Sequence, residues 1–120
     1  GESLSLGEAT VRLESVSYKR GNGVFSAPTN KHYAIVTLSV TNRSDSPINV
    51  LPALDTYMRD AKGTTVYLTP FTLSSPFKAG ELAAGETVRG ELSYLVPQKD
   101  DLKFYVDSSW SGGIIKYDIQ

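Results

Sequence analysis

The sequence contains no cysteine and only one histidine, one tryptophan and one methionine among its 120 residues. Without cysteine the chain has no disulfide, no thiol nucleophile and no cysteine-based zinc site. It also lacks a long apolar run that would span a bilayer. Twelve basic and thirteen acidic residues give a net charge of −1, and both signs are mixed along the chain. This balance argues against nucleic acid as a partner and against a polybasic membrane patch.

A chain of this length is expected to form one domain, residues 1–120, that buries roughly two-thirds of its unfolded surface. The sequence shows no signal peptide and no lipidation cysteine. We therefore expect contact with a membrane only through a lipid anchor upstream of Gly1.

Turn residues recur at short intervals, and the stretches between them are rich in Val, Ile, Thr, Tyr and Phe. The turn clusters lie at residues 21–23, 42–47, 60–63, 80–85, 97–100 and 112–113. Short strands separated in this way predict an all-β fold, an immunoglobulin-like antiparallel β-sandwich of about 7–8 strands. No segment predicts a helix.

Two strands show the clearest alternation, Tyr33–Asn42 and Thr87–Val96. Side chains point alternately to the two faces of a strand, so one set in each is expected to form core. The expected core residues are Ala34, Val36, Leu38 and Val40 in the first strand, and Val88, Gly90, Leu92, Tyr94 and Val96 in the second. The opposite face of Thr87–Val96 is expected to be half-solvated.

The remaining strands are shorter or irregular. In Ala9–Arg20 the apolar phase shifts between the pair Val11, Leu13 and the pair Val16, Tyr18, which predicts a β-bulge near Glu14–Ser15 that turns both pairs inward. Leu54–Arg59 and Thr64–Leu68 are expected to form a hairpin around Asp60–Gly63, a type I turn with a G1 bulge. Alternating apolar residues also predict strands over Leu102–Asp107 and Ile115–Ile119.

Residues 80–87 read GELAAGET, one letter away from the phosphate-binding pattern G-x-x-x-x-G-K-[ST]. Glu86 stands where that loop has its lysine, and a carboxylate there repels a phosphate. A strand pattern follows, whereas a phosphate-binding loop opens a helix. We therefore assign Gly80 and Gly85 to a turn that leads into a strand, and expect no nucleotide.

The motifs between Asn42 and Pro97 have a recognisable order. They read N-x-[SD]-x-x-P-I-x-V, then D-x-x-G, then L-x-x-G-E-x-V-x-G-x-L-x-Y-x-V-P. This order resembles the immunoglobulin-like domain of unknown function found in secreted and lipid-anchored proteins of Gram-positive bacteria, which is related in fold to a mycobacterial secreted immunogenic antigen. The resemblance covers nearly the whole chain. It implies an extracytoplasmic β-sandwich, often the outer part of a lipoprotein, and assigns no catalytic residue.

Residues that could carry chemistry are few. His32 opens a strand, which is typical of a polar surface residue, and no serine lies in a G-x-S-x-G elbow. Asp100 and Asp101 lack the spacing of a calcium loop and are assigned to a solvated turn. Asn42 begins a glycosylation sequon, but its expected role is in a turn. We therefore predict no enzyme activity, no catalytic residue, no cofactor and no metal.

Five apolar residues are candidates for a contact surface: Phe25, Phe71, Leu73, Phe77 and Trp110. The connection Thr69–Ala84 is long for a sandwich, so its apolar side chains either plug an open edge or contact a partner. Trp110 either caps one end of the core or anchors a partner, and Phe25 is expected to pack back onto the domain. Convergence of these residues at one end would make a binding site.

These features favour a non-enzymatic extracytoplasmic module, secreted or lipid-anchored at the cell surface, that acts in protein interaction or adhesion. Two alternatives stay open. One is an inhibitor-like sandwich that presents residues 69–84 to a protease. The other is a sensor of a small ligand or lipid, which requires an apolar cavity between the sheets of roughly 300 Å³ or more. The chain is expected to be a monomer or a weak homodimer.

Overall fold

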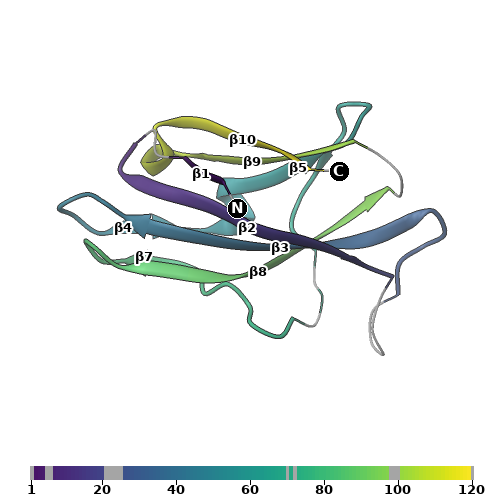
Figure 1. Ribbon diagram of the computed structural model, residues 1–120, viewed down its shortest axis with the longest axis horizontal. Coiled ribbons are helices and arrows are strands. Elements are labelled where there is room, and N and C mark those ends of the chain that lie inside the picture. Colours follow the sequence, from purple (N-terminus) through teal and green to yellow (C-terminus); the bar gives the residue numbers. More distant parts are fainter. Residues whose placement is uncertain are drawn as a thin grey trace.

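The computed structural model describes residues 2–4, 7–20, 26–69, 71, 73–97 and 101–119. Two antiparallel sheets lie one above the other (Figure 1). The first sheet has the order β1-β2-β3-β8, formed by Glu2–Leu4, Ala9–Lys19, Lys31–Asn42 and Thr87–Pro97. The second has the order β10-β9-β5-β6, formed by Gly113–Ile119, Leu102–Ser108, Thr56–Arg59 and Thr65–Val66. The expected all-β antiparallel sandwich is confirmed.

Three short strands and two helical turns were not expected. Strand β1 pairs with β2, while β4 (Ile48–Val50) pairs with β7 (Gly80–Leu82) in a small sheet of their own. Helix α1 covers Pro52–Asp55, and the 3-10 turn η1 covers Ser109–Ser111. The expectation of no helix is therefore wrong at α1, where a proline at the first turn supplies a backbone angle that suits a helix start. This turn also replaces the first two residues of the strand expected over Leu54–Arg59.

The core lies between the two large sheets and contains the residues expected from the alternation. Val36 and Leu38 of β3, Phe104 of β9 and Ile115 of β10 are all at most 1% exposed. Ile48, Val50 and Leu82 of the small sheet join the same apolar cluster. Burial of a side chain of this size contributes about 1.5–3 kcal/mol, so the alternating positions carry most of the stabilisation.

The β-bulge in β2 is confirmed. The register between β2 and β3 shifts between Leu13 and Ser15, which puts Val16 opposite Val36 and Tyr18 opposite Ala34. Val16 packs against the core, but Tyr18 is 38% exposed. The expectation that both apolar pairs turn inward is thus wrong for Tyr18, because the strand runs past the end of the core there.

The expected hairpin around Asp60–Gly63 is confirmed, although β6 is only two residues long. Gly63 has a φ of 82°, and its N–H donates to the carbonyl of Asp60 at 3.0 Å. The turn before β8 differs from the expectation. Gly85, with a φ of 81°, belongs to it, but Gly80 opens strand β7, so a pairing strand occupies part of the predicted turn.

The connection between β6 and β7 pairs with the edge of β8 and packs Phe71 on Tyr33 at the outer face of the first sheet. Its backbone follows β8, where Glu91 N–H donates to Ser75 and Phe77 N–H donates back to Glu91. A carboxylate oxygen of Glu91 accepts a third bond, from Ser75 N–H at 3.0 Å. Both faces of this part of the sheet are therefore covered, and Tyr33, Ile35, Thr37 and Ser93 on the outer face are buried. The expectation of a half-solvated face on β8 is wrong where the connection lies.

Asn42 joins the end of β3 to the turn that follows. Its side-chain amide donates to the carbonyls of Ser46, at 2.8 Å, and Leu82, at 2.9 Å. Its side-chain oxygen accepts from the N–H and the hydroxyl of Ser44. Asn42 is fully buried, and both amide hydrogens are used. The turn role is confirmed, and this nitrogen is not available to a glycan in the folded chain.

Candidate functional site

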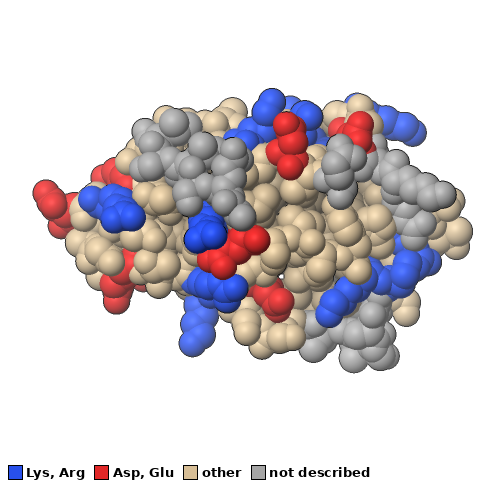
Figure 2. All heavy atoms as spheres, in the orientation of Figure 1, with Lys and Arg blue, Asp and Glu red and all other residues tan. Residues whose placement is uncertain are grey.

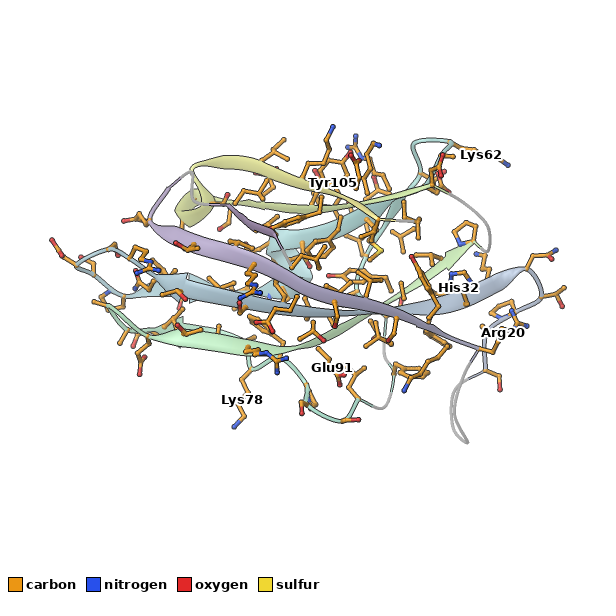
Figure 3. All side chains as sticks on the ribbon, in the orientation of Figure 1. Arg20, His32, Lys62, Lys78, Glu91 and Tyr105 are labelled. Atoms are coloured by element: carbon orange, nitrogen blue, oxygen red, sulfur yellow. The ribbon has the colours of Figure 1, made fainter. Side chains whose placement is uncertain are left out.

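The outer face of the second sheet carries a cluster of tyrosines, which we call the tyrosine face. It consists of the outward side chains of four neighbouring strands and the residue after β6: Tyr57, Arg59, Thr65, Tyr67, Lys103, Tyr105, Asp107, Ile114, Lys116 and Asp118. Their inward neighbours, including Met58, Phe104 and Val106, are fully buried, so the alternation of each strand directs this set to solvent. Figure 3 labels Tyr105 on the side of the molecule opposite Glu91 and Lys78.

The centre of this face is a stack of two rings. Tyr57 of β5 and Tyr105 of β9 are cross-strand partners, and their rings lie 4.8 Å apart with an interplanar angle of 11°. The Arg59 guanidinium lies 5.6 Å from the Tyr57 ring centre and 5.5 Å from that of Tyr105. Tyr67 extends the row, with its ring 6.5 Å from that of Tyr57. Stacking and cation–π contacts hold these side chains in place, although each of them is partly or fully exposed.

Charge is distributed unevenly over the tyrosine face. Arg59 and Lys103 are cross-strand partners on one side of the ring stack, and Asp107 lies on the other side. Lys103 bonds Asp118 at 3.0 Å, whereas Arg59 makes no ion pair with any described residue. Burial raises the pKa of Tyr57, and Arg59 opposes that rise. The tyrosine therefore stays neutral at physiological pH. On the side of the molecule that Figure 2 shows, positive and negative side chains are intermixed.

Three of the predicted contact residues belong to the connection on the other sheet. Phe71 packs its ring 4.5 Å from that of Tyr33 at the start of β3. Phe77 lies against the core, and its backbone crosses Gly90. Leu73, which lies between Phe71 and Phe77 in the sequence, is half-buried. The connection thus covers the sheet, while the contact role predicted for these residues stays a prediction.

The predicted tryptophan caps the core. Trp110 lies in η1, is 3% exposed and belongs to the apolar cluster. Its carbonyl accepts from Glu8 N–H at the end of the sandwich where β3 finishes, far from Tyr33 and Phe71. Of the two roles expected for Trp110, the structure therefore shows the cap on one end of the core, while its contact role stays a prediction. Phe25 lies outside the described residues, and the described candidates do not converge.

His32 is half-buried at the start of β3. Its ring lies edge-on to Tyr18, with the ring centres 4.5 Å apart, and no described residue gives its Nε2 a hydrogen bond. Burial lowers the pKa of His32, and the charge of Arg20 lowers it further. Figure 3 shows both residues at the same end of the molecule. A neutral ring packed on a tyrosine fits a structural role.

The described residues contain no group of three or more His, Cys, Asp or Glu that could hold a metal. Asp101 is exposed, and Asp100 lies outside the described residues. In the part of the chain that the structure describes, no helix has both the length and the apolar character needed to cross a bilayer.

A small pocket lies beside α1. It has a volume of about 230 Å³ and is lined by Leu51, Pro52, Ala53, Leu54 and Ala79. Leu54 is 77% exposed. This pocket opens on the surface and is not the inter-sheet cavity that the ligand-sensing alternative requires. Large side chains such as Tyr94 and Phe104 fill the space between the sheets instead.

Sequence reasoning missed the tyrosine face. The alternation of apolar residues in Leu102–Asp107 leaves Tyr105 on the face opposite them, but it gives this tyrosine no further role. The available signal was the high number of tyrosines, seven in 120 residues. Three of them, Tyr57, Tyr67 and Tyr105, occupy outward positions where charged residues are the common choice. Their proximity depends on the register of β5 with β9, which the sequence does not reveal.

Solved structures with this fold are found in several bacteria. A "putative lipoprotein (ycdA)" from Bacillus subtilis superposes with a TM-score of 0.83 at 19% identity over 98% of this chain, which spans 38% of that chain's length. The yjhA protein of Bacillus subtilis gives a TM-score of 0.75 at 18% identity, covering 100% of this chain and 96% of that one. An uncharacterized β-sandwich protein from Clostridium difficile gives 0.63 at 10% identity, covering 100% and 91%.

These identities are low, so the three structures show a shared fold and nothing further. Among curated proteins, none matches this sequence. A family model matches residues 1–116, almost the entire chain. The chain belongs to the family described as Domain of unknown function (DUF4352).

Proposed function

We propose that this chain is a non-enzymatic module that binds a protein partner outside the cytoplasm, and that the tyrosine face is its contact surface. The observation that carries the proposal is the stack of Tyr57 on Tyr105 beneath Arg59. Tyrosine and arginine are the residue types that most often dominate protein interfaces. Rings that are already held in place lose little side-chain freedom when a partner binds.

Two further points support the proposal. The family description assigns no chemistry, which favours a binding role over catalysis. The lipoprotein description of the ycdA neighbour favours a location at the cell surface, where a binding module meets its partners. The inhibitor-like alternative loses support, because residues 75–77 are hydrogen-bonded along β8 and do not protrude as a bait loop.

The test is site-specific photocross-linking in cells that carry the full-length protein. A photoreactive residue replaces Tyr67, which is 62% exposed at the end of the aromatic row. Matched probes replace Leu73, in the connection over β8, and Arg12, which is exposed on the outer face of β2. We expect a defined cross-linked protein from position 67 only, and expect it to disappear when Tyr57 and Tyr105 are both changed to alanine.

Equal labelling from positions 67 and 12 would show that the tyrosine face has no specific partner. Labelling from position 73 instead would move the contact surface to the segment that contains Phe71 and Phe77. Protease added to intact cells should cleave the protein if it lies outside the cytoplasm. Turnover of a hydrolase substrate that is lost in His32→Ala would contradict the non-enzymatic part of the proposal.

A further inference from the structure

The two outer faces of the sandwich differ in how much of their surface other segments of the chain bury. The connection between β6 and β7 pairs with the edge of β8 and packs Phe71 on Tyr33, and Tyr33, Ile35 and Ser93 on this outer face are at most 5% exposed. No described segment lies over the tyrosine face. Tyr67 and Ile114 there are 62% and 56% exposed. The uncovered face therefore has apolar surface that another molecule can bury.

The strand registers arrange the tyrosine face in three rows that run across the strands. The first row holds Arg59, Lys103 and Asp118, and the middle row holds Tyr57, Tyr105 and Lys116. The third row holds Asp107 and Ile114. The first row carries one more positive than negative charge, and the third row carries one negative charge. The outer rows stand four residues apart along β9, which is about 13 Å.

This order of charges is complementary to itself. In an isologous pair the same surface of each copy meets the other across a two-fold axis. An axis that lies in the interface along the middle row places the tyrosines of one copy against those of the second. It also places Lys103 of each copy opposite Asp107 of the other, with Arg59 on the neighbouring strand beside that pair. Lys116 ends the middle row on the edge strand β10, at the rim, where solvent screens its charge.

We propose that the tyrosine face binds a second copy of this chain, with the tyrosine rows in contact and the Arg59 row of each copy facing Asp107 of the other. This inference rests on the proposed function, since it names one partner for the same surface. Tyrosine rows supply the apolar contact, and the charge pairs set the orientation. Other occupants, such as an acidic protein of another kind, would not require the negative charge of Asp107.

The experiment measures association of the purified chain by sedimentation velocity from micromolar to millimolar concentration. We expect a reversible dimer. Arg59→Glu and Asp107→Arg should each weaken association by at least about tenfold, because each brings like charges close together at two places in the contact. An equimolar mixture of the two variants should regain the dimer, since the two introduced side chains then lie close together with opposite charge, while the original Arg59 and Asp107 do the same at the second place. Arg12→Glu, on the outer face of β2, should leave association unchanged.

Three results would overturn the inference: a monomer at every concentration, single variants that associate as tightly as the unmodified chain, or a mixture that fails to regain the dimer. Thermal unfolding of each variant checks that the fold is intact, and Tyr67→Lys provides a second way to disrupt the contact. A chain that is monomeric but still cross-links a different protein from position 67 removes the dimer and leaves the proposed function standing.

Discussion

The hydroxyl groups of Thr56 and Tyr94 lie 2.6 Å apart in the buried space between the two sheets. Thr56 belongs to β5 and Tyr94 to β8, so this contact joins one sheet to the other. The Thr56 hydroxyl also lies 2.6 Å from the carbonyl of Pro52, to which it donates its single hydrogen. Tyr94 must therefore be the donor in the contact between the two hydroxyls. Burial raises the pKa of Tyr94, which keeps that proton in place.

Removing the Tyr94 hydroxyl should destabilise the fold less than removing the Thr56 hydroxyl. Tyr94→Phe removes one hydrogen bond and should lower the free energy of unfolding by about 1 kcal/mol. Thr56→Val leaves the Tyr94 hydroxyl buried without an acceptor and should lower it by about 1–3 kcal/mol. Denaturant unfolding of both single variants and the double variant shows which variant is less stable and measures the coupling free energy between the two hydroxyls. A Tyr94→Phe variant that is less stable than Thr56→Val would contradict the assigned direction of the bond.

Gly90 should not tolerate even a methyl group. A Cβ there would lie 2.4 Å from the Cα and 2.6 Å from the amide nitrogen of Phe77. Gly90→Ala should lower the free energy of unfolding by about 1–3 kcal/mol, the usual range for overpacking, or more. Because the clashing atoms are backbone, a second change of Phe77→Ala should bring no recovery. Recovery in the double variant would place the crowding in the side chain instead.

Gly85 offers a matched comparison. Nothing lies within 4 Å of a Cβ built there, but its φ of 81° is unfavourable for other residues. Gly85→Ala should be destabilising by about 1–2 kcal/mol through backbone strain alone. Gly85→Asn should be destabilising by less, since asparagine adopts this conformation more readily. Thermal unfolding of the two variants distinguishes strain from crowding.

The buried amide of Asn42 should be among the most sensitive polar groups. Asn42→Ala leaves the carbonyls of Ser46 and Leu82 without their side-chain donor, and should lower the free energy of unfolding by roughly 2–4 kcal/mol. Ser44→Ala, which removes one partner of the Asn42 side-chain oxygen in a less buried place, is the control and should have a smaller effect. Equal losses in the two variants would show that the amide is not the centre of the network.

His32 should make stability depend on pH near neutrality. Its pKa in the fold is lowered below the ordinary value of about 6.5, mainly by burial. At a pH between the lowered pKa of the fold and the ordinary value, His32 therefore binds a proton in the unfolded chain but not in the folded chain. The stabilising effect of the neutral ring is complete above about pH 6.5 and decreases as the pH falls toward the lowered pKa of the fold. His32→Gln should remove this slope.

The measurement is the melting temperature of the unmodified chain and of His32→Gln at several pH values between about 5 and 8. Carboxylates titrate at lower pH and contribute little in that window. Parallel profiles for the two proteins would show that His32 does not titrate differently in the folded and unfolded chain.

Much of the fold was predictable from alternation alone. Strands β3 and β8 are long enough to show several periods of apolar and polar residues, and the shift within β2 marked its bulge. Strands β1, β4 and β7 have three residues each, which is too short to show a period. Helix α1 is one turn long and carried no helical periodicity.

Contacts between segments that lie far apart in the sequence could not be predicted from it. Tyr33 and Ile35 were left out of the expected core because they alternate with core residues, yet both are buried, and Phe71, about 40 residues downstream, packs on Tyr33. The tyrosine face was missed for the same reason. Alternation separated Tyr105 from the apolar residues of β9, but no face was predicted for Tyr57 or Tyr67. The meeting of Tyr57 with Tyr105 depends on which strands become neighbours.

The bonding of Thr69, Ser75 and Phe77 along β8 has a consequence for how closely copies of the protein can be packed. The backbone N–H of Glu91 and the carbonyls of Glu91 and Ser93 already have partners within the chain, so this part of the first sheet's margin offers no template for a foreign strand. Unpaired edge strands are where chains add to one another and form fibrils. We expect copies crowded together on a surface to remain separate folded units at this margin.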